Sequence, residues 1–143
     1  MKYSKPYLIF TLLVWLPWGL LCIFNTDIVR EIIGVTSIHP SGNTDVRVMY
    51  GGVQTAVGLL AALALRDRRH FEKLLWPLAF LGSSMALSRL YGLTVDGSGT
   101  VYTWGVLAYE AFAGTSAIVW LILLPRLQER QGSRGSEQLE GAP

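Results

Sequence analysis

Charged residues and cysteine are both scarce in this sequence. Asp, Glu, Lys and Arg make up 15% of the 143 residues, against roughly a quarter in soluble proteins. The net charge of +2 is too small to indicate nucleic-acid binding, and we predict no nucleic-acid partner. The single cysteine, Cys22, cannot form an intramolecular disulfide and lies within an apolar run, where we expect it to pack as a small hydrophobe.

The residues that build most catalytic and metal sites are also few. The only two histidines, His39 and His70, lie in separate polar segments, which excludes paired haem ligation and a His-based metal site. The sequence contains no Walker loop, dinucleotide fingerprint, nucleophile elbow or zinc-protease motif. We therefore predict no metal, no cofactor and no catalytic residues, and we favour a protein that is not an enzyme.

Apolar residues, by contrast, make up 51% of the chain and gather in four long runs. Each run is close to the roughly 20 residues that a helix needs to cross a bilayer core. A soluble four-helix bundle would carry a polar outer face on each helix. The sequence predicts an all-α, four-helix transmembrane bundle as one membrane domain over residues 1–125, with spans at about 7–24, 46–65, 72–93 and 102–124.

The ends of the chain and the cationic residues give an expected orientation. Nine of the twelve Lys and Arg residues lie in the N-terminal segment, in the 66–73 loop and after residue 125. The positive-inside rule then places both termini in the cytoplasm. The first run follows Lys2 and Lys5 and lacks a cleavage pattern, so we expect it to be a retained signal anchor. Residues 126–143 have too little apolar content to order and are predicted to form a disordered cytoplasmic tail.

The segment between the first two spans is predicted to contain a short interfacial helix. Asp27 can cap it, and Gly34 is placed to end it. Its apolar residues share one face, which is typical of a helix lying on a membrane surface. We expect the second span to begin near residue 45.

One polar stretch marks the start of that second span. Arg47, Tyr50, Gly51 and Gln54 recur at spacings of three and four, so they share one helix face. A cation, a phenol and an amide on one face of a membrane helix are expected to point toward protein rather than lipid. This stretch is the first candidate for a functional site.

Two further charged residues, Arg89 and Glu110, lie within the third and fourth spans. Counting from the helix ends places them at a similar depth, and we expect them to pair, with Arg47 nearby. One interpretation is a purely structural cluster that fixes helix order. The other is an outer pocket whose excess of arginine over acid binds a phosphate or carboxylate group. Arg47, Tyr50, Gln54, Arg89 and Glu110 form the predicted ligand-binding or structural cluster.

Small residues mark the surfaces where helices are expected to approach closely. Glycine lacks a side chain, so it permits short distances between helix backbones in membranes. The predicted helix-packing residues are Gly51, Gly52, Gly58, Gly82 and Gly114.

The motif Arg47-x-x-Tyr50-Gly51-Gly52, followed by Gly58, Arg89-x-x-Gly92 and the Asp96-Gly97 turn, resembles an uncharacterised bacterial family of four-span membrane proteins with a domain of unknown function. The resemblance covers roughly residues 7–124. It implies four membrane helices and a multi-pass protein of the bacterial inner, or cytoplasmic, membrane. It implies no activity.

These observations leave three functional classes open. The favoured one is a small membrane protein that binds an anionic lipid or amphiphile in its outer polar pocket. The alternatives are a subunit of an oligomeric proton- or solute-coupled transporter, with Glu110 as the embedded acid, and a lipid-modifying membrane enzyme. The expected partners are membrane lipids, with a homo-oligomer or a larger membrane complex as further possibilities.

Overall fold

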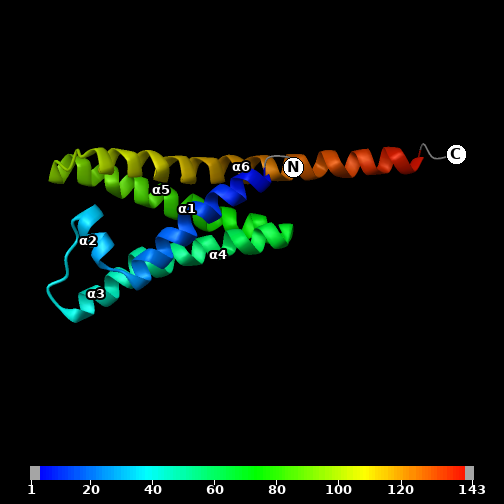
Figure 1. Ribbon diagram of the computed structural model, residues 1–143. Coiled ribbons are helices and arrows are strands. Elements are labelled where there is room, and N and C mark those ends of the chain that lie inside the picture. Colours follow the sequence, from blue (N-terminus) through cyan, green and yellow to red (C-terminus); the bar gives the residue numbers. More distant parts are fainter. Residues whose placement is uncertain (1–3, 141–143) are drawn as a thin grey trace. The chain divides into compact units, whose positions relative to one another are not determined.

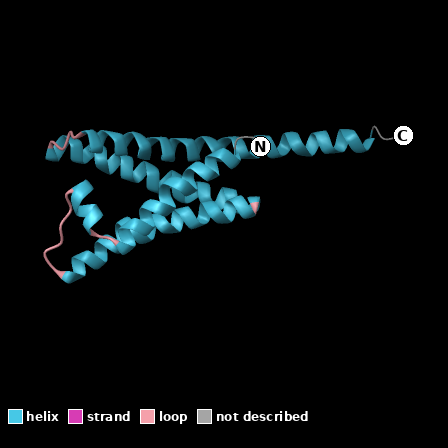
Figure 2. Ribbon diagram, in the orientation of Figure 1, coloured by secondary structure: helices cyan, strands magenta, loops and turns pink. Residues whose placement is uncertain are grey.

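The computed structural model describes residues 4–140, and helices account for most of them (Figures 1 and 2). The elements in order are α1 (Ser4–Phe24), α2 (Asp27–Ile33), α3 (Pro40–Val46), the π-helix η1 (Arg47–Gly52), α4 (Val53–Arg66), the 3₁₀ turn η2 (Arg68–His70), α5 (Phe71–Asp96) and α6 (Val101–Glu140). No strand occurs between residues 4 and 140. The predicted all-α class is confirmed.

Four helical stretches are long and apolar enough to cross a membrane. They are Ser4–Phe24, Pro40–Arg66, Phe71–Asp96 and Val101–Arg126. The second stretch joins α3, η1 and α4 end to end. The prediction of four long apolar helices is therefore confirmed, and these helices indicate a multi-pass integral membrane protein.

The chain divides into two compact units at Leu74. In the first unit α1 packs along η1 and α4. The buried residues of α1 recur every three or four positions, which is the period of one helix face. They are Ser4, Leu8, Thr11, Trp15, Gly19 and Cys22. The edge-to-face contact between the rings of Tyr7 and Phe71, 6.3 Å apart, ties the start of α1 to the start of α5 within this unit.

The second unit, from Leu75, is a hairpin of α5 and α6. Residues 97–100 connect the two helices, and Gly97 adopts a φ of 63°, which glycine accommodates without a Cβ clash. Thr100 caps α6, since its Oγ1 accepts a hydrogen bond from the Thr103 amide at 3.2 Å. The two helices run side by side in Figure 1 (green to orange), joined by the ion pair and close glycine contacts described below.

The start of the second span differs from the sequence prediction. The second span begins at Pro40 rather than near residue 45, because Pro40 occupies the first helical turn, where its missing amide hydrogen costs nothing. The helix α6 extends to Glu140, residues 141–143 lie outside the described residues, and the disorder of residues 126–143 stays a prediction.

The predicted short helix is present as α2. It ends at Gly34, whose φ of 82° is the left-handed conformation of a helix C-cap. The start of α2 differs from the prediction that Asp27 caps it, because Asp27 is the first helical residue. Its backbone amide donates a hydrogen bond to Oδ1 of Asn25 at 3.1 Å. Asp27 instead pairs with Arg30 at 3.2 Å, one turn further on.

Candidate functional site

The polar stretch at the start of the second span forms a π-helix. Residues Arg47–Gly52 make up η1, and the amide of Val53 bonds to the carbonyl of Val48, five residues back. Single π-turns within longer helices are rare and occur often at functional sites. The segment that the sequence singles out by its polar residues is thus also irregular in backbone.

Arg47 is anchored to the end of α1. Its NH1 donates a hydrogen bond to the carbonyl of Ile23, in the last turn of that helix. Carbonyls at a helix C-terminus lack intrahelical partners and carry the negative end of the helix dipole, so a guanidinium is well placed there. Arg47 itself is exposed, and none of the ion pairs among the described residues includes it. Its positive charge therefore has no carboxylate partner in this part of the chain.

Tyr50 and Gln54 follow Arg47 on η1 and the first turn of α4. Both are half-buried, and no hydrogen bond between described residues uses either side chain. A phenol and an amide next to an unpaired guanidinium could donate hydrogen bonds to oxygen atoms of the same ligand.

Arg89 and Glu110 are joined across the α5–α6 hairpin. Arg89 Nε donates to Glu110 Oε2 at 2.8 Å, and its NH2 donates to Oε1 at 2.7 Å. The Glu110 side chain is 1% exposed and that of Arg89 is 26% exposed. This two-point pairing of a guanidinium with a carboxylate is the strongest common form of ion pair. It balances the two charges within the hairpin.

The structure therefore groups the predicted polar cluster into two sets. Arg47, Tyr50 and Gln54 belong to the first unit, whereas Arg89 and Glu110 belong to the second. The charge of Arg89 is matched by Glu110, and that of Arg47 is not matched by any acid among the described ion pairs. The arginine excess inferred from the sequence resides at Arg47.

Glycines lie at the closest approaches of the helices. A Cβ atom on Gly82 would lie 2.6 Å from the Gly114 backbone nitrogen, and one on Gly114 would lie 2.8 Å from that of Ser83. In the first unit a Cβ on Gly58 would lie 2.7 Å from Leu16 Cα, and one on Gly51 would lie 3.0 Å from the Ile23 nitrogen. Backbone atoms cannot move aside as a flexible side chain can, so a larger residue would push the helices apart.

Gly52 and Gly19 differ from the expected packing pattern. Gly52 is exposed, and a Cβ there would meet only the Arg47 carbonyl oxygen at 3.9 Å, an ordinary contact. Gly19 is buried, and a Cβ there would lie 2.5 Å from the nitrogen and Oγ1 of Thr55. Gly19 is not among the predicted packing residues, although it lies on the same face of α1 as Trp15 and Cys22.

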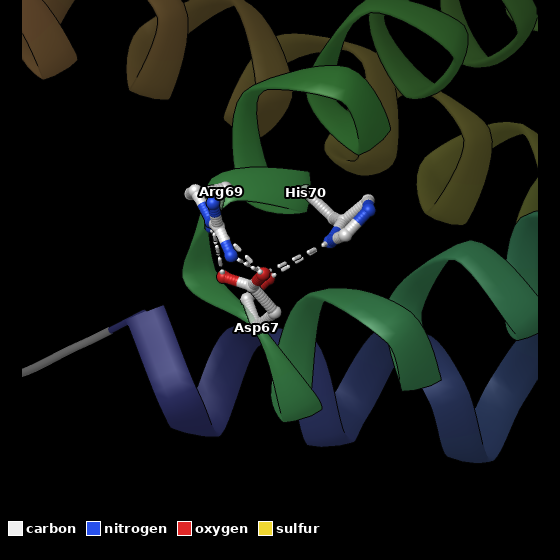
Figure 3. A network of polar contacts seen from close by, with 3 residues as sticks. All are labelled: Asp67, Arg69 and His70. Carbon is white, nitrogen blue, oxygen red and sulfur yellow. Dashed lines mark hydrogen bonds and ion pairs between the residues drawn. The ribbon is translucent and has the colours of Figure 1, made fainter.

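A polar network organises the connection between α4 and α5 (Figure 3). Asp67 Oδ1 accepts a hydrogen bond from the Arg69 amide at 3.0 Å, and Oδ2 accepts one from Arg69 Nε at 3.0 Å. His70 Nδ1 lies 3.9 Å from Asp67 Oδ2. The hydrogen bond from the Arg69 backbone, followed by the charge and hydrogen bond of its guanidinium, lowers the pKa of Asp67 below its ordinary value. Asp67 thus stays ionised and holds the basic loop in a defined turn.

The family of the chain follows from its sequence as a whole. The family described as Domain of unknown function (DUF4345) matches residues 4–121. The chain belongs to the DUF4345 family. No curated protein and no solved structure matches it. The DUF4345 match includes η1, the Arg89–Glu110 pair and all the close glycine contacts, and its description assigns no activity to them.

Proposed function

We propose that this DUF4345 protein binds the headgroup of an anionic lipid or amphiphile at Arg47 and is not an enzyme. The supporting observation is the guanidinium of Arg47, which is held at the end of α1 by the Ile23 carbonyl and has no carboxylate partner among the described ion pairs. Arginine binds phosphate and carboxylate groups through two parallel hydrogen bonds. One nitrogen positions the side chain, and the remaining donors are left for the ligand.

The location of Arg47 supports a lipid rather than a soluble anion. Arg47 lies within the second apolar stretch, Pro40–Arg66, one to two helical turns from its N-terminal end, and next to the exposed side chains of Val48 and Met49. The positive-inside rule assigns this end of the helices to the outer leaflet of a cytoplasmic membrane. A phosphate held there would have its acyl chains beside the apolar surface of the helix.

The Arg89–Glu110 pair supports a structural role and not the transporter alternative. A proton-coupled transporter needs an acid whose oxygens can reach a proton pathway, whereas both carboxylate oxygens of Glu110 accept hydrogen bonds from Arg89. The pair joins the two helices of the hairpin as an interhelical fastener would. We therefore place the lipid site at Arg47 and the fastener at Arg89 and Glu110.

The test compares bound lipid in purified variants. Wild type, Arg47→Gln, Arg47→Lys and the control Arg126→Gln are incorporated into nanodiscs of phosphatidylcholine with phosphatidylglycerol, released, and analysed by native mass spectrometry. We expect Arg47→Gln to lose most retained phosphatidylglycerol and Arg47→Lys to lose part of it, because lysine cannot reproduce the two-point contact. Arg126→Gln removes an exposed cation at the end of the fourth apolar stretch and should retain the lipid. Equal retention in wild type and Arg47→Gln would refute the proposal.

A further inference from the structure

A polar hollow of about 170 Å³ lies in the segment that links α1 to the second span. Its walls come from α2, from the loop that follows it and from α3, the cyan part of Figure 1. Two valines line it together with six polar residues, which are Thr26, Asp27, Arg30, Thr36, Ser37 and Asn43. A hollow with so polar a lining does not suit an acyl chain or another apolar ligand.

The charges in this hollow cancel. Asp27 and Arg30 form an ion pair at 3.2 Å, and both side chains remain more than half exposed. A free anion or cation gains no net electrostatic attraction from a pair whose charges cancel. A zwitterionic headgroup would have to separate the pair in order to match each of its charges. A neutral ligand with hydroxyl groups needs no such rearrangement, because each hydroxyl can both donate and accept a hydrogen bond at the edge of the pair.

The remaining polar groups are suited to the same kind of ligand. None of the hydrogen bonds among the described residues uses the side chains of Thr26, Thr36 or Asn43. Ser37 donates its proton to the His39 carbonyl, which leaves its oxygen as an acceptor. Two free hydroxyls, an amide and an acceptor oxygen in one hollow match the alternating donors and acceptors of a sugar or glycerol.

Exposed apolar side chains flank this hollow in the sequence. Phe24, two residues before Thr26, is 78% exposed, and Ile38, directly after Ser37, is 92% exposed. Ile32 on α2 is also exposed. Apolar side chains beside a polar site are typical of segments that lie in the interfacial layer of a membrane, where headgroups are found.

We propose that this hollow binds the polyhydroxylated headgroup of a membrane glycolipid. This site is independent of Arg47, because it rests on different residues and on a neutral ligand. The sugar would bond to Thr36 and Asn43 and to the outer edge of the Asp27–Arg30 pair, while the lipid chains lie in the bilayer beside the flanking apolar residues.

The test uses nanodiscs of phosphatidylcholine that contain monoglucosyl diacylglycerol, with retained lipid measured by native mass spectrometry. Wild type should retain the glucolipid, and Thr36→Val and Asn43→Leu should each reduce retention roughly 3- to 10-fold, as the loss of one hydrogen bond predicts. Thr44→Val is the matched control, since Thr44 is an exposed threonine on α3 that does not line the hollow. Its retention should equal that of wild type.

Two further experiments distinguish a glycolipid from a soluble sugar and from phospholipids. Methyl glucoside at millimolar concentration should displace little glucolipid if the lipid anchor contributes to binding, whereas full displacement would overturn the assignment to a lipid.

Nanodiscs with phosphatidylethanolamine or phosphatidylglycerol in place of the glucolipid should give no retention that depends on Thr36 or Asn43. The proposal would be refuted if wild type retained either phospholipid and Thr36→Val abolished that retention. It would also be refuted if none of the variants changed the retention of glucolipid. Arg47→Gln should leave glucolipid retention unchanged, so the two sites fail or succeed separately.

Discussion

Arg89 on α5 and Glu110 on α6 share two hydrogen bonds of 2.8 and 2.7 Å, and the Glu110 side chain is 1% exposed. A single charged residue in the middle of a membrane helix costs roughly 2.5 to 3.5 kcal/mol on insertion scales. Pairing the two charges within one hairpin removes most of this cost, because the pair enters the apolar layer as a neutral unit. The pair therefore favours the one register of the α5–α6 hairpin in which Arg89 and Glu110 lie at the same depth.

Removing the carboxylate should destabilise the hairpin. Glu110→Gln leaves the Arg89 guanidinium without its counter-charge, and breaking a fully buried pair costs about 3–5 kcal/mol. We expect a loss of a few kcal/mol at most, because the Arg89 side chain is 26% exposed and can reach water. Glu110→Asp should lose less, since it keeps the charge. The measurement is the free energy of unfolding in detergent.

The matched control is Glu72→Gln, which removes an exposed acid from the first turn of α5 and should change stability little. The double variant Arg89→Gln/Glu110→Gln should recover part of the loss, because it leaves no unpaired charge. A melting temperature for Glu110→Gln equal to that of wild type would contradict the structural role of the pair.

The close approach of α5 and α6 at glycine gives a second prediction. Gly82→Ala places a methyl group 2.6 Å from the Gly114 backbone nitrogen, so the helices must separate. Overpacking of this kind costs typically about 1–3 kcal/mol. Gly105→Ala is the control, because a Cβ there has no atom within 4 Å among its surroundings and alanine favours the helix. Unfolding measurements should show a loss for Gly82→Ala and no loss for Gly105→Ala; equal values would exclude a tight contact at Gly82.

The long apolar runs and the Arg89–Glu110 pair could be anticipated from the sequence for physical reasons. Membrane helices need a minimum length, and charges inside them need partners at the same depth. Arg89 and Glu110 were expected at one level by counting residues from the helix ends, and the structure contains this pair. Helix length and the depth of a residue both follow from counting residues along each helix axis.

The π-helix at Arg47–Gly52 could not be predicted in this way. Polar residues at spacings of three and four suggest an ordinary α-helix, and residue types do not specify a shift from four-residue to five-residue hydrogen bonds. The bond from Arg47 to Ile23 joins residues on two helices, so their separation depends on how α1 packs against η1. The hollow between α2 and α3 likewise depends on the path of a loop. Pro40 is the one local signal in the sequence for the earlier helix start, because proline suits the first helical turn.

The basic loop gives a prediction on pH. The pKa of Asp67 is lowered from its ordinary value of 3.8, first by the Arg69 backbone amide and then by its guanidinium. An acid with a lowered folded-state pKa contributes to loop stability above about pH 4, and this contribution is lost as the pH falls below 3.8 through the folded value. The Arg69 amide resonance in micelles should therefore titrate with a midpoint below 3.8. In Asp67→Asn the same resonance should not titrate, and a midpoint above 3.8 in wild type would contradict the hydrogen bonds of Figure 3.

Orientation in the membrane is the last prediction, and it rests on the distribution of cations. The 66–73 loop holds four Lys and Arg residues, whereas residues 97–100 hold none, so the first should face the cytoplasm and the second the outside. Cys22→Ala supplies a thiol-free background. His70→Cys keeps every cation of the loop, and in intact cells it should resist an impermeant maleimide and react only after permeabilisation. Ser98→Cys should react in intact cells. The opposite labelling pattern would invert the orientation and would move the Arg47 site to the inner leaflet.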